Sequence, residues 1–82
     1  MTRLFKLDDT YSVVCESQGT RNGFRHVAVL LRGGYEVSRC KISYLNRTWE
    51  RFEFESVLNK TLDYFKDTQE RLKYKKVIAE FN

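Results

Sequence analysis

The dipeptide Gly33-Gly34 restricts the fold of this chain more than any other feature, because strand-like sequence lies directly on either side of it. The segments "FRHVAVLLR" and "YEVSRCKISY" before and after it are rich in β-branched and aromatic residues, which favour strands. Glycine suits the two-residue turns of β-hairpins, whose central residues take positive φ. The sequence therefore predicts an antiparallel hairpin closed by Gly33-Gly34.

This turn also predicts which residues of the hairpin face one another. Arg32 pairs with Tyr35, and a regular ladder is expected to continue from there. The pairs that follow are Leu31 with Glu36, Val29 with Ser38, and Val27 with Cys40. In this register the core face carries Val27, Val29, Leu31, Cys40, Ile42 and Tyr44. The opposite, mixed face carries Phe24, His26, Ala28, Leu30, Val37, Arg39, Lys41 and Ser43.

A further strand is expected before the hairpin. The segment "TYSVVCES" alternates Tyr11, Val13 and Cys15, which we assign to the core face, with the residues between them, and an Asn-Gly turn signal follows it. In the resulting meander Cys15 and Cys40 lie two strand spacings apart, about 9.5 Å. Bridged Cα atoms lie within about 7 Å, so we expect no disulfide between them.

The remainder of the chain has helical periodicity. One apolar stripe predicts a helix and consists of Phe54, Val57, Leu58, Thr61, Leu62 and Phe65. Thr48 is a candidate cap for its start. A rotated stripe follows a new capping signal, "KDT", and consists of Tyr74, Val77, Ile78 and Phe81. We therefore expect an α+β fold, in which a three-stranded antiparallel β-meander precedes one or two C-terminal helices, in a single small domain over residues 1–82.

The composition argues against several classes of function. The longest apolar run, "VAVLL", is far shorter than the roughly 20 residues of a membrane helix, and "MTRLFKLDD" has no apolar leader core, so we expect a soluble cytoplasmic protein without a membrane partner. The single histidine and two dispersed cysteines lack the spacing of a metal site or a catalytic pair. We predict no enzymatic activity, no metal and no cofactor. The net charge of +4 favours polyanionic partners weakly.

The mixed face is the strongest candidate for a binding surface. Its stackable rings and cations resemble the platforms that bind single-stranded nucleic acid. The residues concerned are Phe24, His26, Arg39 and Lys41, with Arg32 and Tyr35 near the hairpin tip. The alternative is that the C-terminal helix or a second subunit covers this face, because its apolar residues need cover. Cations elsewhere are candidate contacts or simply a solvated surface, and these are Arg47, Arg51, Lys73, Lys75 and Lys76.

The segment "RCKISYLNRTWERFEFESVLNKTL", residues 39–62, resembles small proteins encoded by phages and other mobile elements of bacteria. The resemblance implies a phage-type accessory protein in the cytoplasm of a bacterial host, but it implies no particular activity. Proteins of that kind often act by binding, as inhibitors of host defence such as anti-CRISPR proteins do. The resulting hypothesis is a non-catalytic protein that binds a host protein or nucleoprotein complex, most simply one that handles nucleic acid. The alternative is a small regulator that binds DNA or RNA directly through the mixed face and the basic C-terminal helix, and a homodimer is left open.

Overall fold

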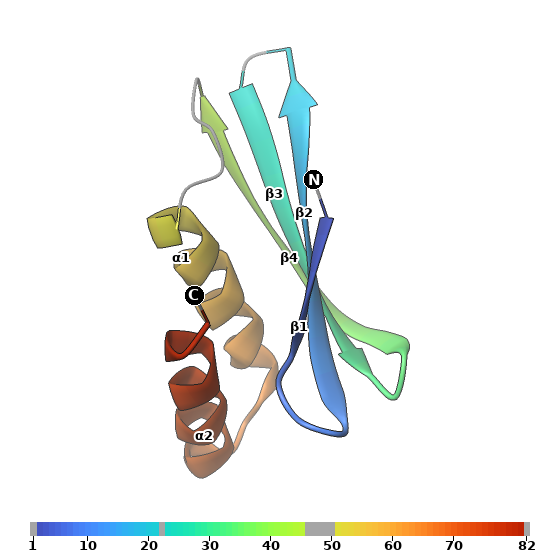
Figure 1. The fold of residues 1–82 in the computed structure, drawn as a ribbon, viewed down its shortest axis with the longest axis vertical. Coiled ribbons are helices and arrows are strands. Elements are labelled where there is room, and N and C mark those ends of the chain that lie inside the picture. The colour runs from blue at the N-terminus through green and yellow to red at the C-terminus, as the bar shows by residue number, and fades with distance from the viewer. Residues whose placement is uncertain (1, 22, 46–50, 82) are drawn as a thin grey trace.

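The computed structural model describes residues 2–21, 23–45 and 51–81, with the backbone alone for residues 20, 24, 42–45 and 51–54. Within this part of the chain, four strands form one antiparallel sheet in the order β1-β2-β3-β4, and two helices lie against the same face of it (Figure 1). The strands are β1 (Thr2–Lys6), β2 (Tyr11–Thr20), β3 (Gly23–Arg32) and β4 (Tyr35–Leu45). The helical elements are α1 (Arg51–Thr61), the short 3-10 turn η1 (Leu62–Tyr64) and α2 (Thr68–Ala79). The predicted α+β class is therefore confirmed.

The prediction of three strands is wrong, because β1 adds a further strand at the edge of the described sheet. β1 pairs antiparallel with β2, so that Leu4 faces Val14 and Phe5 faces Val13. The segment "TRLFK" is short and charged, and carries little strand signal of its own. Contacts with distant residues hold it in place. The ring centroids of Phe5 and Phe81, at opposite ends of the chain, lie 4.9 Å apart. Pairing of this kind is not visible in local sequence.

The hairpin turn has the predicted geometry. Gly33 and Gly34 have φ values of 56° and 87°, which are typical of a turn with positive φ at both central residues. The Gly33 N–H also donates to the Thr10 carbonyl over 2.9 Å, which ties this turn to the start of β2. Arg32 pairs with Tyr35, as predicted.

The predicted register holds for one further pair, Leu31 with Glu36, and then fails at a β-bulge. Leu30 pairs with Ser38, so one extra residue, Val37, is inserted into β4. The predicted pairs of Val29 with Ser38 and Val27 with Cys40 are wrong. In the structure Val29 faces Arg39, Val27 faces Lys41, and Cys40 faces Ala28.

Because of the bulge, the side of β3 that Cys40 shares, and that is buried, is the opposite of the predicted side. His26, Ala28 and Leu30 have no solvent exposure and face the helices, whereas they were predicted on the mixed face. Of the predicted core face, the assignments of Tyr11, Val13, Cys15 and Cys40 are confirmed, because these residues are buried or pack against the core. Val27, Val29 and Leu31 lie on the sheet face opposite Ala28 and Leu30, so their assignment to the face beneath the helices is wrong, although Val27 is buried as predicted. The predicted core positions Ile42 and Tyr44 have no described side chain.

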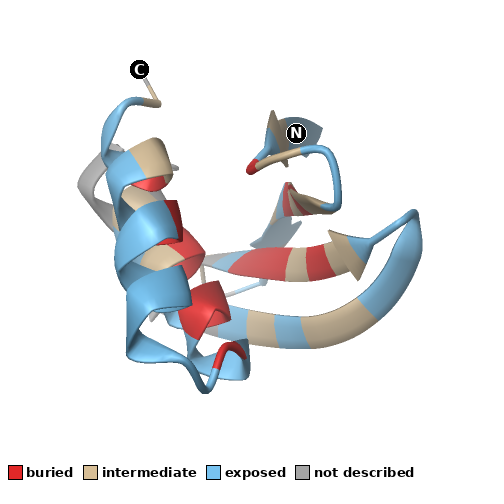
Figure 2. Cartoon of the chain, turned by 90° about the horizontal axis from the view of Figure 1, so that it is seen from below, coloured by how far each residue is buried: buried red, intermediate tan, exposed pale blue. Residues whose placement is uncertain are grey.

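Of the one or two helices predicted, two are present among the described residues, and most members of each predicted stripe are buried or pack against the core. Five residues of the first stripe are buried, namely Val57, Leu58, Thr61, Leu62 and Phe65. The helical structure ends with η1 at Tyr64, and a new helix begins after Asp67. Asp67 caps α2 by accepting the Gln69 N–H over 3.0 Å. Tyr74 and Ile78 of α2 are buried in the same core. Figure 2 shows buried residues on the sides of the helices that face the sheet. The predicted first-helix cap, Thr48, lies outside the described residues.

The two cysteines are free, as predicted. Both face Ala28 of the strand between them, Cys15 from β2 and Cys40 from β4, so the width of β3 separates their thiols. The Cys40 thiol donates instead to the Val57 carbonyl of α1 over 3.5 Å. Small thiols therefore fill space where α1 packs on the sheet.

Candidate functional site

The sheet has a second face, which we call the open face, because none of the described elements lies against it (Figure 1). It consists of the residues that alternate with the buried ones along each strand. Val27 illustrates the distinction: it is 7% exposed, yet it does not belong to the cluster of core residues around Ala28 and Leu30. The open face carries Leu4, Lys6, Ser12, Val14, Glu16, Arg25, Val27, Val29, Leu31, Glu36, Arg39 and Lys41.

Strand pairing arranges these residues in rows across the sheet. The central row runs Leu4, Val14, Val29, Arg39. One neighbouring row runs Lys6, Ser12, Leu31, Glu36, and the other runs Thr2, Glu16, Val27, Lys41. The apolar residues are therefore contiguous, and Leu4, which is 68% exposed, is their most accessible member. An apolar centre with a charged border is typical of a docking surface.

Charges on the border of the open face include one well-defined pair. Arg39 donates to both carboxylate oxygens of Glu36, over 2.8 Å and 3.4 Å. The hydrogen bond from Arg39 lowers the pKa of Glu36 and raises that of Arg39. Both side chains are about half exposed, so the pair orients Arg39 more than it stabilises the fold. Arg25 and Lys41 are further exposed cations on this face.

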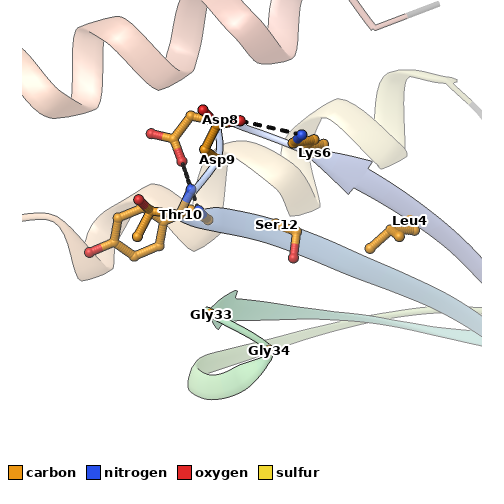
Figure 3. Close-up of a pocket in the computed structure, with 9 residues that line it drawn as sticks. Leu4, Lys6, Asp8, Asp9, Thr10, Ser12, Gly33 and Gly34 are labelled. Carbon is orange, nitrogen blue, oxygen red and sulfur yellow. Dashed lines mark hydrogen bonds and ion pairs between the residues drawn. The ribbon is translucent and has the colours of Figure 1, made fainter.

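A hollow of about 360 Å³ lies at one end of the open face, between the β1–β2 connection and the hairpin turn (Figure 3). Its walls are Leu4, Lys6, Asp8, Asp9, Thr10, Tyr11, Ser12, Gly33 and Gly34. The Lys6 ammonium lies 3.4 Å from the Asp9 carboxylate at its rim, with both side chains exposed. The open face is thus continuous with a concave region that a projecting group of a partner can enter.

The structure separates the residues of the predicted binding platform. Arg39 and Lys41 lie on the open face, whereas His26 is buried beneath the helices. Ala28 and Leu30 of the predicted mixed face are buried, but the helix packed on their strand is chiefly α1, and the C-terminal helix α2 adds Tyr74 and Ile78 to the same core. For Phe24 only the backbone is described. The bulge is the cause, because it moves Arg39 and Lys41 to the side opposite His26.

The remaining predicted contact residues are dispersed. Arg32 and Tyr35 are exposed at the hairpin tip, and Tyr35 is 79% exposed. On α2, Lys73 lies 3.6 Å from the Asp8 carboxylate, whereas Lys75 lines a groove that faces α1. Lys76 is exposed. Arg47 lies outside the described residues, and Arg51 is described by its backbone alone.

Sequence reasoning missed the apolar members of the open face. Leu4 lies in the strand that was not predicted, and Val29 and Leu31 were placed in the core. A signal was present nonetheless: "VVC" and "VAVLL" put apolar residues at consecutive positions, and such a strand is apolar on both faces. That pattern indicates a sheet with two surfaces to cover.

Comparisons with known proteins add no relative: no family model matches the chain, and no match is found among curated proteins or solved structures. Within the described residues, no helix is long and apolar enough to span a membrane. No three His, Cys, Asp or Glu side chains of the described part gather as ligands for a metal ion.

Proposed function

We propose that this protein is a non-catalytic binding module that docks on another protein through its open face. The observation that carries the proposal is the contiguous apolar centre of Leu4, Val14, Val29 and Leu31, which the helices do not cover: Leu4 is exposed and the other three are partly buried. Soluble domains rarely expose such a patch without using it. Arg39 and Lys41 stand at its border, where charged residues give specificity and speed association with an oppositely charged partner.

A protein partner fits this surface better than a single-stranded nucleic acid. Stacking platforms need aromatic rings, and none of the described residues of the open face is aromatic. The apolar side chains there are aliphatic, and aliphatic surface is buried well against another protein. The excess of cations over Glu16 and Glu36 favours a partner with an acidic surface.

The resemblance of residues 39–62 to phage accessory proteins supplies the biological setting of the proposal. It suggests a target in a bacterial host, namely a nucleoprotein or a nucleic-acid-handling protein, which the bound module inhibits in the manner of an anti-CRISPR protein. The burial of His26 supports the non-catalytic part of the proposal, because its imidazole has no exposed surface through which a substrate can reach it.

Affinity capture tests the proposal. The immobilised protein is incubated with a nuclease-treated bacterial lysate, and retained proteins are identified by mass spectrometry. We expect Arg39→Glu combined with Lys41→Glu to abolish retention of the specific partner. The matched control, Lys75→Glu combined with Lys76→Glu, makes the same charge change on α2 and is expected to preserve it. Equal retention by the two variants would contradict docking through the open face.

Direct binding of DNA or RNA is the second candidate, because the exposed cations Arg25, Arg39 and Lys41 lie on one face. Phosphate contacts make the affinity fall steeply with salt. On duplex DNA the logarithm of the binding constant falls with the logarithm of the salt concentration, with a slope of about 0.9 per neutralised phosphate. Retention of the purified protein on DNA or RNA that is lost in the Arg39→Glu, Lys41→Glu variant would favour this function. Absence of retention at low salt would exclude it.

A further inference from the structure

The open face has a pattern of residues that is complementary to itself. Consider a second copy whose open face lies on the first, related by a two-fold axis that runs along the strands between β2 and β3. Each β2 then lies over β3 of the other copy, and each β1 lies over β4. In the central row Val14 meets Val29, and Leu4 meets the aliphatic stem of Arg39. The apolar centres of the two copies thus cover one another.

The charges of the open face also match under this operation. In the neighbouring row, Lys6 of each copy lies over Glu36 of the other. Glu16 lies over Val27 of the other copy, with Lys41 on the next strand and Arg25 at the next outward position of β3. Both acids of the face therefore meet cations of the second copy.

The geometry is that of two sheets packed face to face. Such sheets lie about 10 Å apart with their strands within about 30° of one another, and an axis along the strands satisfies this condition. Four strands at a spacing of about 4.8 Å, with about 20 Å of strand length, cover on the order of 400 Å² per copy. Both copies together then approach the lower limit of roughly 1,000 Å² for specific interfaces. An interface of this size predicts a weak, concentration-dependent dimer.

We propose that in the absence of its target the protein self-associates through the open face into this two-fold dimer. The inference rests on the proposed function in that both assign docking to the open face. It adds that target binding and self-association exclude each other, because they bury the same residues. The helices α1 and α2 remain on the outside of the dimer.

Sedimentation velocity of the purified protein tests the dimer without any knowledge of the target. We expect a reversible shift from monomer to dimer as the concentration rises from about 10 μM to about 1 mM. Leu4→Lys should weaken association by at least about tenfold, equivalent to about 1.4 kcal/mol. Leu72→Lys is the matched control, because Leu72 is another exposed leucine, 54% accessible, but lies on α2. A monomer at every concentration, or equal effects of the two substitutions, would overturn the proposal.

A charge exchange identifies the two-fold arrangement itself. Glu16→Lys alone places a new lysine one strand away from Lys41 of the other copy, and Lys41→Glu alone places a new carboxylate one strand away from Glu16 of the other copy. We expect each variant to self-associate at least about tenfold more weakly than the wild type, and an equimolar mixture to recover association as a heterodimer. Recovery requires that the two residues be neighbours between copies. A mixture no stronger than its components would overturn this arrangement.

The two proposals fail separately. A protein that stays monomeric but captures a partner through Arg39 and Lys41 refutes the dimer and leaves the proposed function intact. A dimer that no lysate protein dissociates or joins supports self-association and refutes the target.

Discussion

Asp8 connects the β1–β2 turn to α2 through a single carboxylate. Its Oδ1 atom accepts the N–H groups of Thr10 and Tyr11 over 2.8 Å and 2.7 Å. Its Oδ2 atom accepts the Tyr74 hydroxyl over 2.6 Å and lies 3.6 Å from the Lys73 ammonium. Burial acts to raise the pKa of Asp8, but these hydrogen bonds and the nearby charge outweigh it, so the pKa lies below its usual 3.8. Burial and the bond to Asp8 raise the pKa of Tyr74.

The lowered pKa predicts a contribution of Asp8 to stability that depends on pH. A group with a depressed pKa in the folded state stabilises the fold above its ordinary pKa, here 3.8, and this stabilisation is lost as the pH falls through the lower folded value. We expect Asp8→Ala to reduce the free energy of unfolding at pH 7 by about 1–3 kcal/mol. Its effect should shrink below about pH 3.8 in urea titrations. Asp9→Ala, at a fully exposed neighbour, should cost little at either pH, and an equal loss would contradict the assignment.

Cys15 is predicted to be chemically inert in the folded protein. Burial is the main cause that raises the pKa of its thiol to about 12, and its exposed fraction is 1%. The reactive species is the thiolate, which is therefore both scarce and inaccessible at neutral pH. In a Cys40→Ser background, we expect Cys15 to react with a disulfide reagent at pH 8 only after unfolding in urea. The Cys15→Ser variant retains the half-buried Cys40 and should react faster, and equal rates would contradict the prediction.

At the scale of elements, the β3–β4 turn shows what local sequence controls. Gly33 and Gly34 both have positive φ, and the space that a β-carbon would occupy at either position has no neighbouring atom within 4 Å. The backbone conformation alone therefore decides which side chains the turn accepts. Asparagine tolerates this conformation, while β-branched residues strain it by about 1–2 kcal/mol.

This difference gives a prediction for the turn. We expect Gly33→Asn to change the free energy of unfolding by less than about 0.5 kcal/mol and Gly33→Val to lower it by about 1–2 kcal/mol. Denaturant unfolding of the two variants measures the difference. Similar costs would show that contacts, rather than φ, restrict the position.

The bulge in β4 shows what local sequence does not control. A regular ladder from the hairpin turn is the simplest continuation, and it puts Val27 opposite Cys40. The structure instead inserts Val37, which lets Val37 and Cys40 both pack against the core beneath the helices. The helices that bury these residues lie later in the chain. A shift of one residue moves every side chain beyond it to the opposite face, so one missed bulge misplaced the whole core face.

At the scale of the whole molecule, two leucines on opposite faces of the sheet provide a direct test of the fold. Leu30 has no exposure and lies in the core, whereas Leu4 is 68% exposed on the open face. We expect Leu30→Ala to lower the free energy of unfolding by about 2–5 kcal/mol, which is a large fraction of the stability of a small domain. Leu4→Ala should change it by less than about 0.5 kcal/mol in dilute protein. Thermal unfolding of both variants measures the contrast, and the reverse order would contradict the observed faces.

The candidate site was predictable only in part. Arg39 and Lys41 were recognised as surface cations from the sequence, and both lie on the open face. Their grouping with His26 was wrong, because it depended on a register that the bulge changes. Leu4, the most exposed apolar residue of the site, could not be assigned without β1, whose contacts are with β2 and with the C-terminal end of the chain.

The amino-acid sequence by itself determined the elements whose signals are local. The Gly-Gly turn, the two helical stripes and the Asp67 cap are set by conformational preferences and periodicity within a few residues, and all of them were predictable. The tertiary structure decided the addition of β1, the bulge at Val37 and the face of the sheet that the helices bury. These features depend on how much apolar surface each arrangement removes from water when all the elements pack together. The same packing left the second face of the sheet exposed, and so created the candidate site.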